Sequence, residues 1–371
     1  MNATFPAPDL RGRAVAVGMS GGVDSTMAAL LLRRAGAEVV GLTMQIWDGS
    51  LAIPDEGRSG CYGPGEARDI EAAAAAARRL GIPHRVVPLA PEYGREVLDY
   101  VRAEYRAGRT PNPCVRCNRA VKFGALLEKA AASGAAFDLF ATGHYARIGR
   151  DASDGRPLLC AARDGAKDQS YFLSQLRPAQ LARLVFPLGG MTKEEVRALA
   201  RAEGWPDLAE KAESQDFVES RHYGALFGGE ADAPGEMMDL DGRVVGRHRG
   251  IAHYTVGQRK GLGIGGVREP LYVVRIEAAA NRVVVGPREA LYASRLRAEE
   301  MNWIAIDALP PEGLRAGVRI RQQHAPAPDR VTPAGADAAE AAFDEPQMAV
   351  TPGQAAVLYD GEIVLGAGTI A

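Results

Sequence analysis

The sequence predicts an α/β protein with a doubly wound parallel sheet in its N-terminal part, then a small mixed central domain and a C-terminal β-barrel. Two observations lead to this prediction. Between residues 14 and 145, short apolar runs alternate with longer runs of helical periodicity, which is the pattern of a parallel sheet covered by helices on both faces. After about Lys211, glycine and turn residues become frequent and short strands follow one another, which is typical of all-β structure.

The elements of the parallel sheet can be assigned in chain order from these patterns. The strands are expected at Ala14–Met19, Glu38–Met44, Arg85–Leu89 and Phe137–Thr142. The helices between and after them are expected at Ser25–Ala35, Glu66–Leu80, Pro91–Ala107 and Arg119–Ala132. Ser174–Arg201 is also helical in pattern, with a break at Gly189-Gly190.

The second half of the chain is expected to contain short strands, including Arg243–Gly246, Leu271–Ile276 and Arg282–Gly286. Pro326–Ala341 lacks apolar periodicity, so a loop or hairpin tip is expected there. The predicted boundaries are 1–211 for the N-terminal α/β domain, 212–285 for the central domain and 286–371 for the barrel domain.

Composition excludes several classes of protein. The formal net charge of −2 means that any RNA binding must use local basic patches. Met1–Arg13 has no apolar signal core, and no apolar run approaches the length of a membrane span, so no membrane partner is expected. Four cysteines in 371 residues do not form a disulfide framework, which favours the reducing cytoplasm.

The first candidate site is the loop that follows the first predicted strand. It comprises Gly18, Met19, Ser20, Gly21, Gly22, Val23, Asp24 and Ser25. Adjacent glycines at a strand-to-helix turn let backbone N–H groups point at one anion, and the helix start adds a positive dipole end, so phosphate is the expected ligand. The lysine of a Walker A loop is absent, and the loop instead resembles the pyrophosphate loop of adenylating enzymes. The structural alternative is a glycine-rich turn that only tightens the joint.

The second candidate site is the segment Gly108–Phe123, which contains Cys114 and Cys117. A helix is expected to begin near Asn118, and Arg102–Lys122 holds six basic residues and one acid, Glu104. A helix start among cations favours the thiolate, so Cys117 is expected to be a nucleophile, with Cys114 as helper or metal ligand. Half of a zinc site and a pair of inert cysteines are the alternatives.

Several motifs together resemble the tRNA-specific 2-thiouridylase family, whose members replace oxygen by sulfur at C2 of the wobble uridine of tRNA. The resemblance covers nearly the whole chain. Besides the two sites above, its motifs are Ala141–Arg147, Lys167–Leu173, Tyr254–Gly263 and Thr351–Gln354.

The resemblance implies a set of ligands and roles. It implies that Gly18 to Ser25, Met44 and Gly143 bind ATP and that Mg²⁺ neutralises the phosphates. It also implies that adenylation makes the C2 oxygen of uridine a leaving group, after which Cys117 attacks C2 or delivers sulfur to it. It places the tRNA contacts, around the anticodon loop, at Asn112, Pro113, Cys114, Lys167, Asp168, Gln169, Arg319 and Ile320. A cysteine desulfurase or sulfur-relay protein would donate the sulfur.

Two departures from the family pattern stand out. Ile320 replaces a tyrosine, although Arg315, Arg319, Arg321, His324 and Arg330 still form a cationic cluster suited to phosphate. The family also has a second cysteine, the persulfide carrier, immediately before a Phe-Val pair, whereas this chain reads Ser214-Gln215-Asp216-Phe217-Val218 and has no cysteine after Cys160.

Three explanations of the missing cysteine remain open. In the first, Cys114 and Cys117 carry and resolve the sulfur themselves. In the second, an iron–sulfur cluster on Cys114, Cys117 and a distant ligand such as Cys61 delivers sulfide. In the third, the protein binds tRNA and ATP without thiolation. The intact ATP loop and cysteine segment favour an active enzyme.

Overall fold

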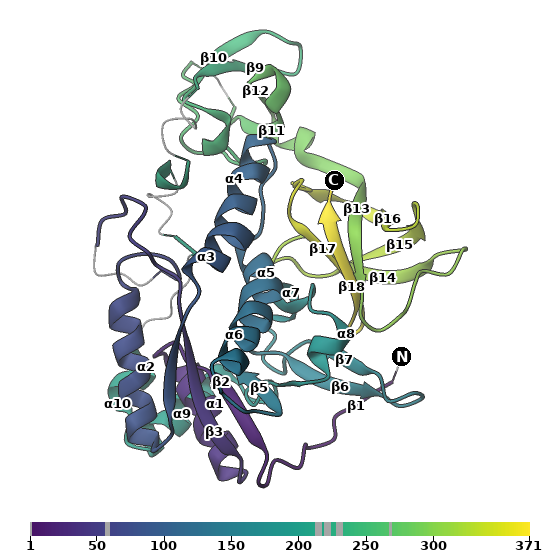
Figure 1. Cartoon of the computed structure of the whole chain (residues 1–371). Coiled ribbons are helices and arrows are strands. Elements are labelled where there is room, and N and C mark those ends of the chain that lie inside the picture. Colours follow the sequence, from purple (N-terminus) through teal and green to yellow (C-terminus); the bar gives the residue numbers. More distant parts are fainter. Residues whose placement is uncertain (1, 56–59, 212–216, 219–223, 228–232, 267–268) are drawn as a thin grey trace.

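The computed structural model describes residues 2–55, 60–211, 217–218, 224–227, 233–266 and 269–371, which form three sheets with helices around the first (Figure 1). The predicted fold class is confirmed: a parallel sheet, a small mixed sheet and a barrel follow one another along the chain. Of the segment around the missing cysteine, only Phe217 and Val218 lie within the described residues.

The parallel sheet contains five described strands in the order β4-β3-β2-β5-β8. Their bounds are β2 Ala14–Gly18, β3 Glu38–Gln45, β4 His84–Pro88, β5 Leu139–Thr142 and β8 Leu184–Val185. The four predicted strands are therefore confirmed with small shifts at their ends. Since all neighbours are parallel, their carboxyl ends share one edge, where ligands of such sheets bind.

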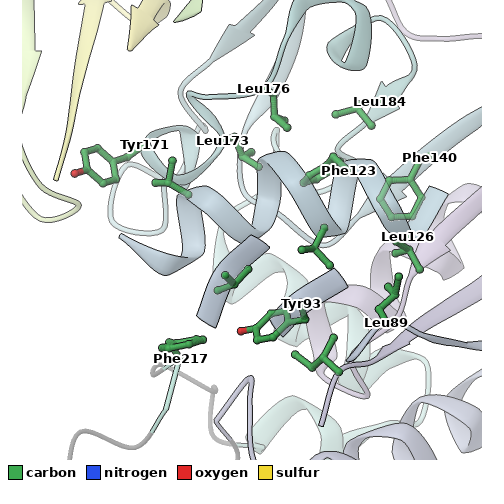
Figure 2. Packing of buried hydrophobic residues seen from close by; sticks show 14 of the residues in the cluster. Leu89, Tyr93, Phe123, Leu126, Phe140, Tyr171, Leu173, Leu176, Leu184 and Phe217 are labelled. Atoms are coloured by element: carbon green, nitrogen blue, oxygen red, sulfur yellow. The ribbon is translucent and has the colours of Figure 1, made fainter. Parts of the chain in front are cut away.

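The period-two pattern of β2 explains why helices cover both faces of the sheet. Val15 and Val17 pack with residues of α1 (Val23–Arg34) and α2 (Glu66–Leu80). Ala16 belongs instead to the larger core, with Phe123, Leu126 and Phe140, whose packing is seen in Figure 2. Both faces are thus buried, which favours the apolar composition of the central strands.

Two long helical segments pass over the second face. The first comprises α3 Ala90–Tyr93, the π-helical η1 Gly94–Leu98 and α4 Asp99–Arg106. The second comprises α5 Pro113–Cys117, the π-helical η2 Asn118–Ala125 and α6 Leu126–Ala132. The prediction of a helix start near Asn118 is wrong: the helix begins at Pro113, because the Asn112 side chain accepts a hydrogen bond from the Val115 N–H (3.2 Å) and proline suits the first helical position.

The predicted helix Ser174–Arg201 is also largely wrong. The region contains the short helix α8 Pro178–Leu181, strand β8 and helix α9 Lys193–Ala202, with α7 Ser170–Leu173 before it and α10 Pro206–Glu210 after it. Pairing of Leu184 and Val185 with β5 overrides the local helical pattern. Close packing also breaks the helix, since a Cβ on Gly189 would lie 1.9 Å from the Ala146 carbonyl oxygen.

The C-terminal region is fully described from residue 292, and there six antiparallel strands close into a barrel through the pairing of β17 with β18. The strands are β13 Tyr292–Trp303, β14 Leu314–Arg319, β15 Ala327–Pro333, β16 Ala338–Met348, β17 Ala355–Asp360 and β18 Ile363–Ile370. Strands β1 Ala3–Thr4, β6 Arg147–Asp151 and β7 Pro157–Cys160 continue the same sheet beside β18. The barrel is therefore joined to the N-terminal half by backbone pairing.

The central region forms a four-stranded sheet in the order β10-β9-β12-β11. Its strands are β9 Gly235–Met238, β10 Val244–His248, β11 Tyr272–Glu277 and β12 Arg282–Gly286, so the three strands predicted here are confirmed with small shifts. Within the described parts of the chain, no helix is long and apolar enough to cross a membrane.

Pro326–Ala341 is a strand hairpin, so its prediction as a loop or tip holds only for the turn between β15 and β16. Small and acidic residues hide the strand pattern: Ala327, Asp329 and Val331 alternate on the buried face of β15. Asp329 is fully buried in the barrel, and burial raises the pKa of its carboxyl group to about 7.

The buried Asp329 carboxyl predicts an inverted pH dependence of barrel stability. The pKa of this carboxyl group is raised on folding, so the folded protein binds the carboxyl proton more tightly than the unfolded chain does. The free energy of unfolding that this group contributes therefore falls as pH rises from about 4 to about 7. We expect Asp329→Asn to raise the melting temperature at pH 7.5 more than at pH 5, as measured by calorimetry. Asp307→Asn, a similar change at an exposed carboxylate paired with Arg156, serves as the control. An equal shift at both pH values for Asp329→Asn would contradict the assignment.

Candidate functional site

A cavity of about 390 Å³ lies at the carboxyl ends of β2, β3 and β5. Its lining includes most of the predicted ATP residues: Gly18, Met19, Ser20, Gly22, Val23, Asp24, Ser25, Met44 and Gly143. Cys117, from the second predicted site, lines the same cavity. The structure thus brings the glycine-rich loop and one of the two predicted catalytic cysteines to a single space.

The loop after β2 has a conformation that requires glycine at position 21. Gly21 has φ +71°, and a Cβ there would lie 2.7 Å from the Ala72 Cβ and 2.8 Å from the Asp69 carbonyl oxygen. Gly22 is the N-cap of α1 and supplies no capping side chain, so the first N–H groups of the helix are available to an anion. This geometry is that of a phosphate-binding loop.

Contacts inside the loop hold it against the end of β5. The Ser25 Oγ accepts a hydrogen bond from the Ser20 N–H (3.2 Å) and donates one to the Gly22 carbonyl (3.2 Å). A Cβ on Gly143 would lie only 2.6 Å from the backbone carbon of Asp24. Glycine at 143 is therefore a condition of the close approach between the end of β5 and the start of α1.

Two lysines that the sequence analysis missed reach this loop. Lys193, buried at the start of α9, pairs with Asp24, with Nζ 2.8 and 2.9 Å from the carboxylate oxygens. The Tyr145 hydroxyl donates to the same carboxylate (2.8 Å). Lys211 donates to the Gly21 carbonyl (3.3 Å). The only sequence signal was the helix-start motif Thr192-x-x-Glu195, which marks α9 but not the target of its lysine.

The acidic residues of the cavity are Asp24, Glu66 and Asp69. The Glu66 carboxylate accepts hydrogen bonds from the N–H groups of Ile46 (2.7 Å) and Trp47 (3.0 Å), while burial raises the pKa of both Glu66 and Asp69. Among the described residues, no three His, Cys, Asp or Glu side chains gather closely enough to hold a metal ion. The described residues thus supply no complete ligand set for an iron–sulfur cluster.

The environment of Cys117 differs from the one expected. Cys117 is the last residue of α5 rather than the first residue of a helix, and burial raises the pKa of its thiol to about 11. Lys122, which also lines the cavity, opposes this effect only in part. The expectation of a favoured thiolate is therefore wrong for the state described here: desolvation outweighs the neighbouring charge.

At least three of the six basic residues around the cysteines are engaged in ion pairs, which weakens their effect on the thiols. Arg109 pairs with Glu104, and Arg116 pairs with Glu96 (2.9 Å) and lies over the Tyr100 ring. Arg102 pairs with Asp99 (2.9 Å). The acids 96 and 99 lie just before the window that the sequence analysis counted, so the excess of positive charge was overestimated.

The loop that precedes α5 is held by the barrel. The Thr110 N–H donates to the Pro352 carbonyl (2.8 Å), and the Gln354 side-chain amide donates to the carbonyls of Thr110 (2.8 Å) and Pro111 (3.3 Å). Gly353, with φ +90°, allows this approach, since a Cβ there would lie 3.0 Å from Thr110 backbone atoms. The Thr351–Gln354 motif therefore positions Asn112, Pro113 and Cys114, none of which lines the cavity.

The remaining predicted RNA contacts differ in accessibility. Gln169 lines the cavity and accepts a hydrogen bond from the Tyr145 N–H (2.9 Å), and Lys167 is half-buried. Asp168 is buried and pairs with Arg319 (2.7 Å), and Ile320 is buried in the barrel core. The internal contacts of the last three explain their place in the fold, whereas their contact with RNA stays a prediction.

His144 also lines the cavity, although the sequence analysis gave it no catalytic role. Its Nδ1 lies 2.7 Å from the Thr142 Oγ1, and its ring packs against Phe123 and Phe186. Burial lowers the pKa of His144 well below its usual value, so the imidazole is neutral at physiological pH. A neutral imidazole leaves the positive charge of the cavity to its lysines.

Comparisons with known proteins agree with this geometry. Profiles described as tRNA methyl transferase HUP domain, tRNA methyl transferase PRC-barrel domain and aminomethyltransferase beta-barrel domain match residues 13–219, 228–287 and 293–370. A tRNA-specific 2-thiouridylase MnmA from Endomicrobium trichonymphae is 45% identical over 96% of this chain and 98% of its own length. The same-named protein of Geotalea uraniireducens is 48% identical over 96% of this chain and 94% of its own. Among solved structures, an NMN synthetase from Francisella tularensis aligns at 15% identity over 58% of this chain and 73% of its own, with a TM-score of 0.32, a likeness too weak to carry an argument.

The hydrogen bonds from Gln354 to the loop before α5 can be tested in solution. We expect Gln354→Ala to speed amide hydrogen exchange across residues 109–117, because the carbonyls of Thr110 and Pro111 lose their barrel partner. The readout is exchange followed by mass spectrometry. Gln347→Ala, which removes another barrel glutamine bound to His324, should leave this segment unchanged. Unaltered exchange in Gln354→Ala would show that the loop is held by other contacts.

Proposed function

Since the chain belongs to the tRNA-specific 2-thiouridylase family, we propose that it catalyses ATP-dependent 2-thiolation of the wobble uridine in the anticodon loop of tRNA. The observation that carries the proposal is the cavity shared by the phosphate-binding loop and Cys117. An adenylating loop and a sulfur nucleophile must reach one base, and one cavity satisfies this requirement. An intact cavity also argues against a relative that binds tRNA and ATP without reacting.

The first half of the reaction activates the base. The residues from Gly18 to Ser25 would bind the phosphates of ATP through backbone N–H groups and the start of α1, with Met44 and Gly143 bordering the nucleotide. Lys122 and Lys211 line the cavity and would stabilise the negative charge that develops as pyrophosphate leaves. Transfer of AMP to the C2 oxygen of uridine makes that oxygen a leaving group.

Mg²⁺ fits this arrangement in a limited way. The ion commonly binds one or two carboxylates together with substrate phosphates, and Asp24 is the carboxylate that the loop itself carries. When bound, Mg²⁺ would neutralise phosphate charge. Asp24 would have to exchange its ion pair with Lys193 for such a role, and this lysine would then be free to contact a phosphate oxygen.

The second half of the reaction introduces sulfur. Cys117 would attack or deliver sulfur at C2 while AMP departs, with Cys114 as helper. Asn112, Pro113 and Cys114, held by the barrel, would contact the target base, and Lys167 and Gln169 would contact the tRNA. Asp168, Arg319 and Ile320 would support that surface from beneath. The sulfur donor would be a persulfide-bearing protein such as a cysteine desulfurase or sulfur-relay protein of the reducing cytoplasm.

The proposed units of the chain follow this division of labour. Residues 1–211 would bind ATP and carry the cysteines, residues 212–285 would form the central domain, and residues 286–371 would form the barrel that contacts tRNA. The contact of Thr351–Gln354 with the cysteine loop supports a direct part for the barrel in the active site.

The proposal predicts separable effects on the two half-reactions. We expect Cys117→Ser to reduce thiolation at least about 100-fold while tRNA-dependent pyrophosphate release stays within about twofold of the parent, because the thiol acts after adenylation. Thiolation is measured as 2-thiouridine by nucleoside mass spectrometry, and Cys160→Ala, at a buried thiol outside the cavity, is the control. A deletion strain complemented with the gene should recover 2-thiouridine at the wobble position. Absence of this nucleoside together with absence of tRNA-dependent pyrophosphate release would refute the proposed function.

A further inference from the structure

We propose that Cys61 is the second sulfur-carrying residue of this site and takes the place of the cysteine missing before Phe217. In this assignment Cys61 accepts sulfur from the donor and Cys117 releases it inside the cavity. The use of that sulfur on tRNA rests on the proposed function, whereas the exchange between the two cysteines does not.

The first observation is that Cys61 and Cys117 line one cavity although they come from distant parts of the chain. Cys61 is exposed, so it lies where the cavity meets solvent, while Cys117 is only partly exposed. A sulfur-donor protein can reach an exposed thiol at the entrance more easily than one that is only partly exposed. The two thiols thus have the positions of an acceptor and an internal partner.

The second observation connects Cys61 to the altered segment of the family pattern. The Tyr62 N–H donates a hydrogen bond to the Phe217 carbonyl (3.0 Å), and the two rings stack with centroids 6.5 Å apart. In the family the second cysteine immediately precedes this phenylalanine, whereas here Cys61 immediately precedes its hydrogen-bonded neighbour. A thiol is therefore supplied one residue away from the contact between Tyr62 and Phe217.

A buried aromatic cluster fixes this neighbourhood. Tyr93 of α3 stacks on Tyr62 (5.4 Å between centroids) and lies 6.3 Å from the Phe217 ring, and Figure 2 shows Tyr93 beside Phe217. Burial raises the pKa of Tyr93, and the nearby thiols of Cys117, Cys61 and Cys114 raise it further. Tyr93 lines the cavity together with Cys61 and Cys117, whereas Cys114 does not line it.

The exchange is balanced in atoms and electrons. A donor persulfide, R–S–SH, transfers its outer sulfur to the Cys61 thiolate and leaves as R–S⁻. The Cys117 thiolate, whose proton has gone to water, then attacks the Cys61 Sγ, so the Cys61–Cys117 disulfide forms and the outer sulfur leaves as HS⁻. On adenylated uridine, HS⁻ attacks C2, AMP leaves with the oxygen, and the remaining proton moves to N3. A dithiol reductant of the thioredoxin class restores both thiols.

The test uses the full-length protein without tRNA or ATP. Reduced protein is mixed with glutathione persulfide, released sulfide is measured, and disulfides are mapped by mass spectrometry after trypsin digestion. Arg116 separates Cys114 from Cys117, so trypsin places these two cysteines on different peptides and each cross-link can be assigned. We expect about one sulfide per protein and a Cys61–Cys117 cross-link.

Single variants make the outcome decisive. Cys117→Ser should accumulate a persulfide on Cys61 without releasing sulfide. Cys61→Ser, a change at an exposed position that is compatible with folding, should lower sulfide release at least about tenfold. Cys160→Ala should behave as the parent. A Cys114–Cys117 cross-link in the parent, or sulfide release by Cys61→Ser at the parental rate, would overturn the proposal.

The tRNA reaction separates this proposal from the proposed function. Pyrophosphate release and 2-thiouridine formation by the parent report the function, whereas the disulfide and the sulfide report the relay without any RNA. If the parent thiolates tRNA with the persulfide donor, Cys61→Ser should lose that thiolation and keep tRNA-dependent pyrophosphate release. Full thiolation by Cys61→Ser would leave the function standing and refute the relay.

Discussion

The buried ion pair between Asp168 and Arg319 joins the two halves of this site. The carboxylate accepts hydrogen bonds from the Ala162 and Ser170 N–H groups, from the Ser170 hydroxyl and from the Arg319 guanidinium. A buried carboxylate is tolerated only when its partners are all present, so the segment before α7 and strand β14 must assemble together. Gln169, the next residue, then enters the cavity. The position of Gln169 in the cavity lining therefore depends on the barrel, although most of the lining comes from the domain of the parallel sheet.

The same dependence appears at the cysteine loop, where backbone atoms of the barrel and the Gln354 amide hold residues 110 and 111. Because the helix that begins at Pro113 follows closely on these two residues, the same contacts position it, and one turn later Cys117 lines the cavity. Two separate barrel contacts thus position Gln169 and Cys117, which line one cavity. This makes the barrel a structural support of the cavity, whose displacement would alter both the cysteine loop and the cavity lining.

The sequence predicted those features of the fold that depend mainly on residues close together in the chain. The alternation in Ala14–Gly18 and the glycines after it indicated a buried strand and a tight glycine-rich turn, and both are present because burial on two faces and φ > 0 at Gly21 constrain those residues directly. The prediction of a helix over Ser174–Arg201 is largely wrong because pairing with β5 and packing at Gly189 involve residues distant in sequence. The contacts of Lys193 and Lys211 with the glycine-rich loop, and the place of Cys61 in the cavity lining, could not be predicted for the same reason. Each residue belongs to a segment whose own pattern does not indicate what it contacts.

The position of Cys117 shows why a second, more exposed sulfur suits this site. Burial of Cys117 comes at the expense of its thiolate population, since burial raises the pKa of this thiol to about 11. A thiolate of high pKa is scarce at neutral pH but strongly nucleophilic once formed. These properties suit attack on a neighbouring persulfide within the cavity better than direct uptake of sulfur from a donor protein. Exposure of Cys61 at the entrance supplies the complementary property, so uptake and release of sulfur can each occur in the environment that favours it.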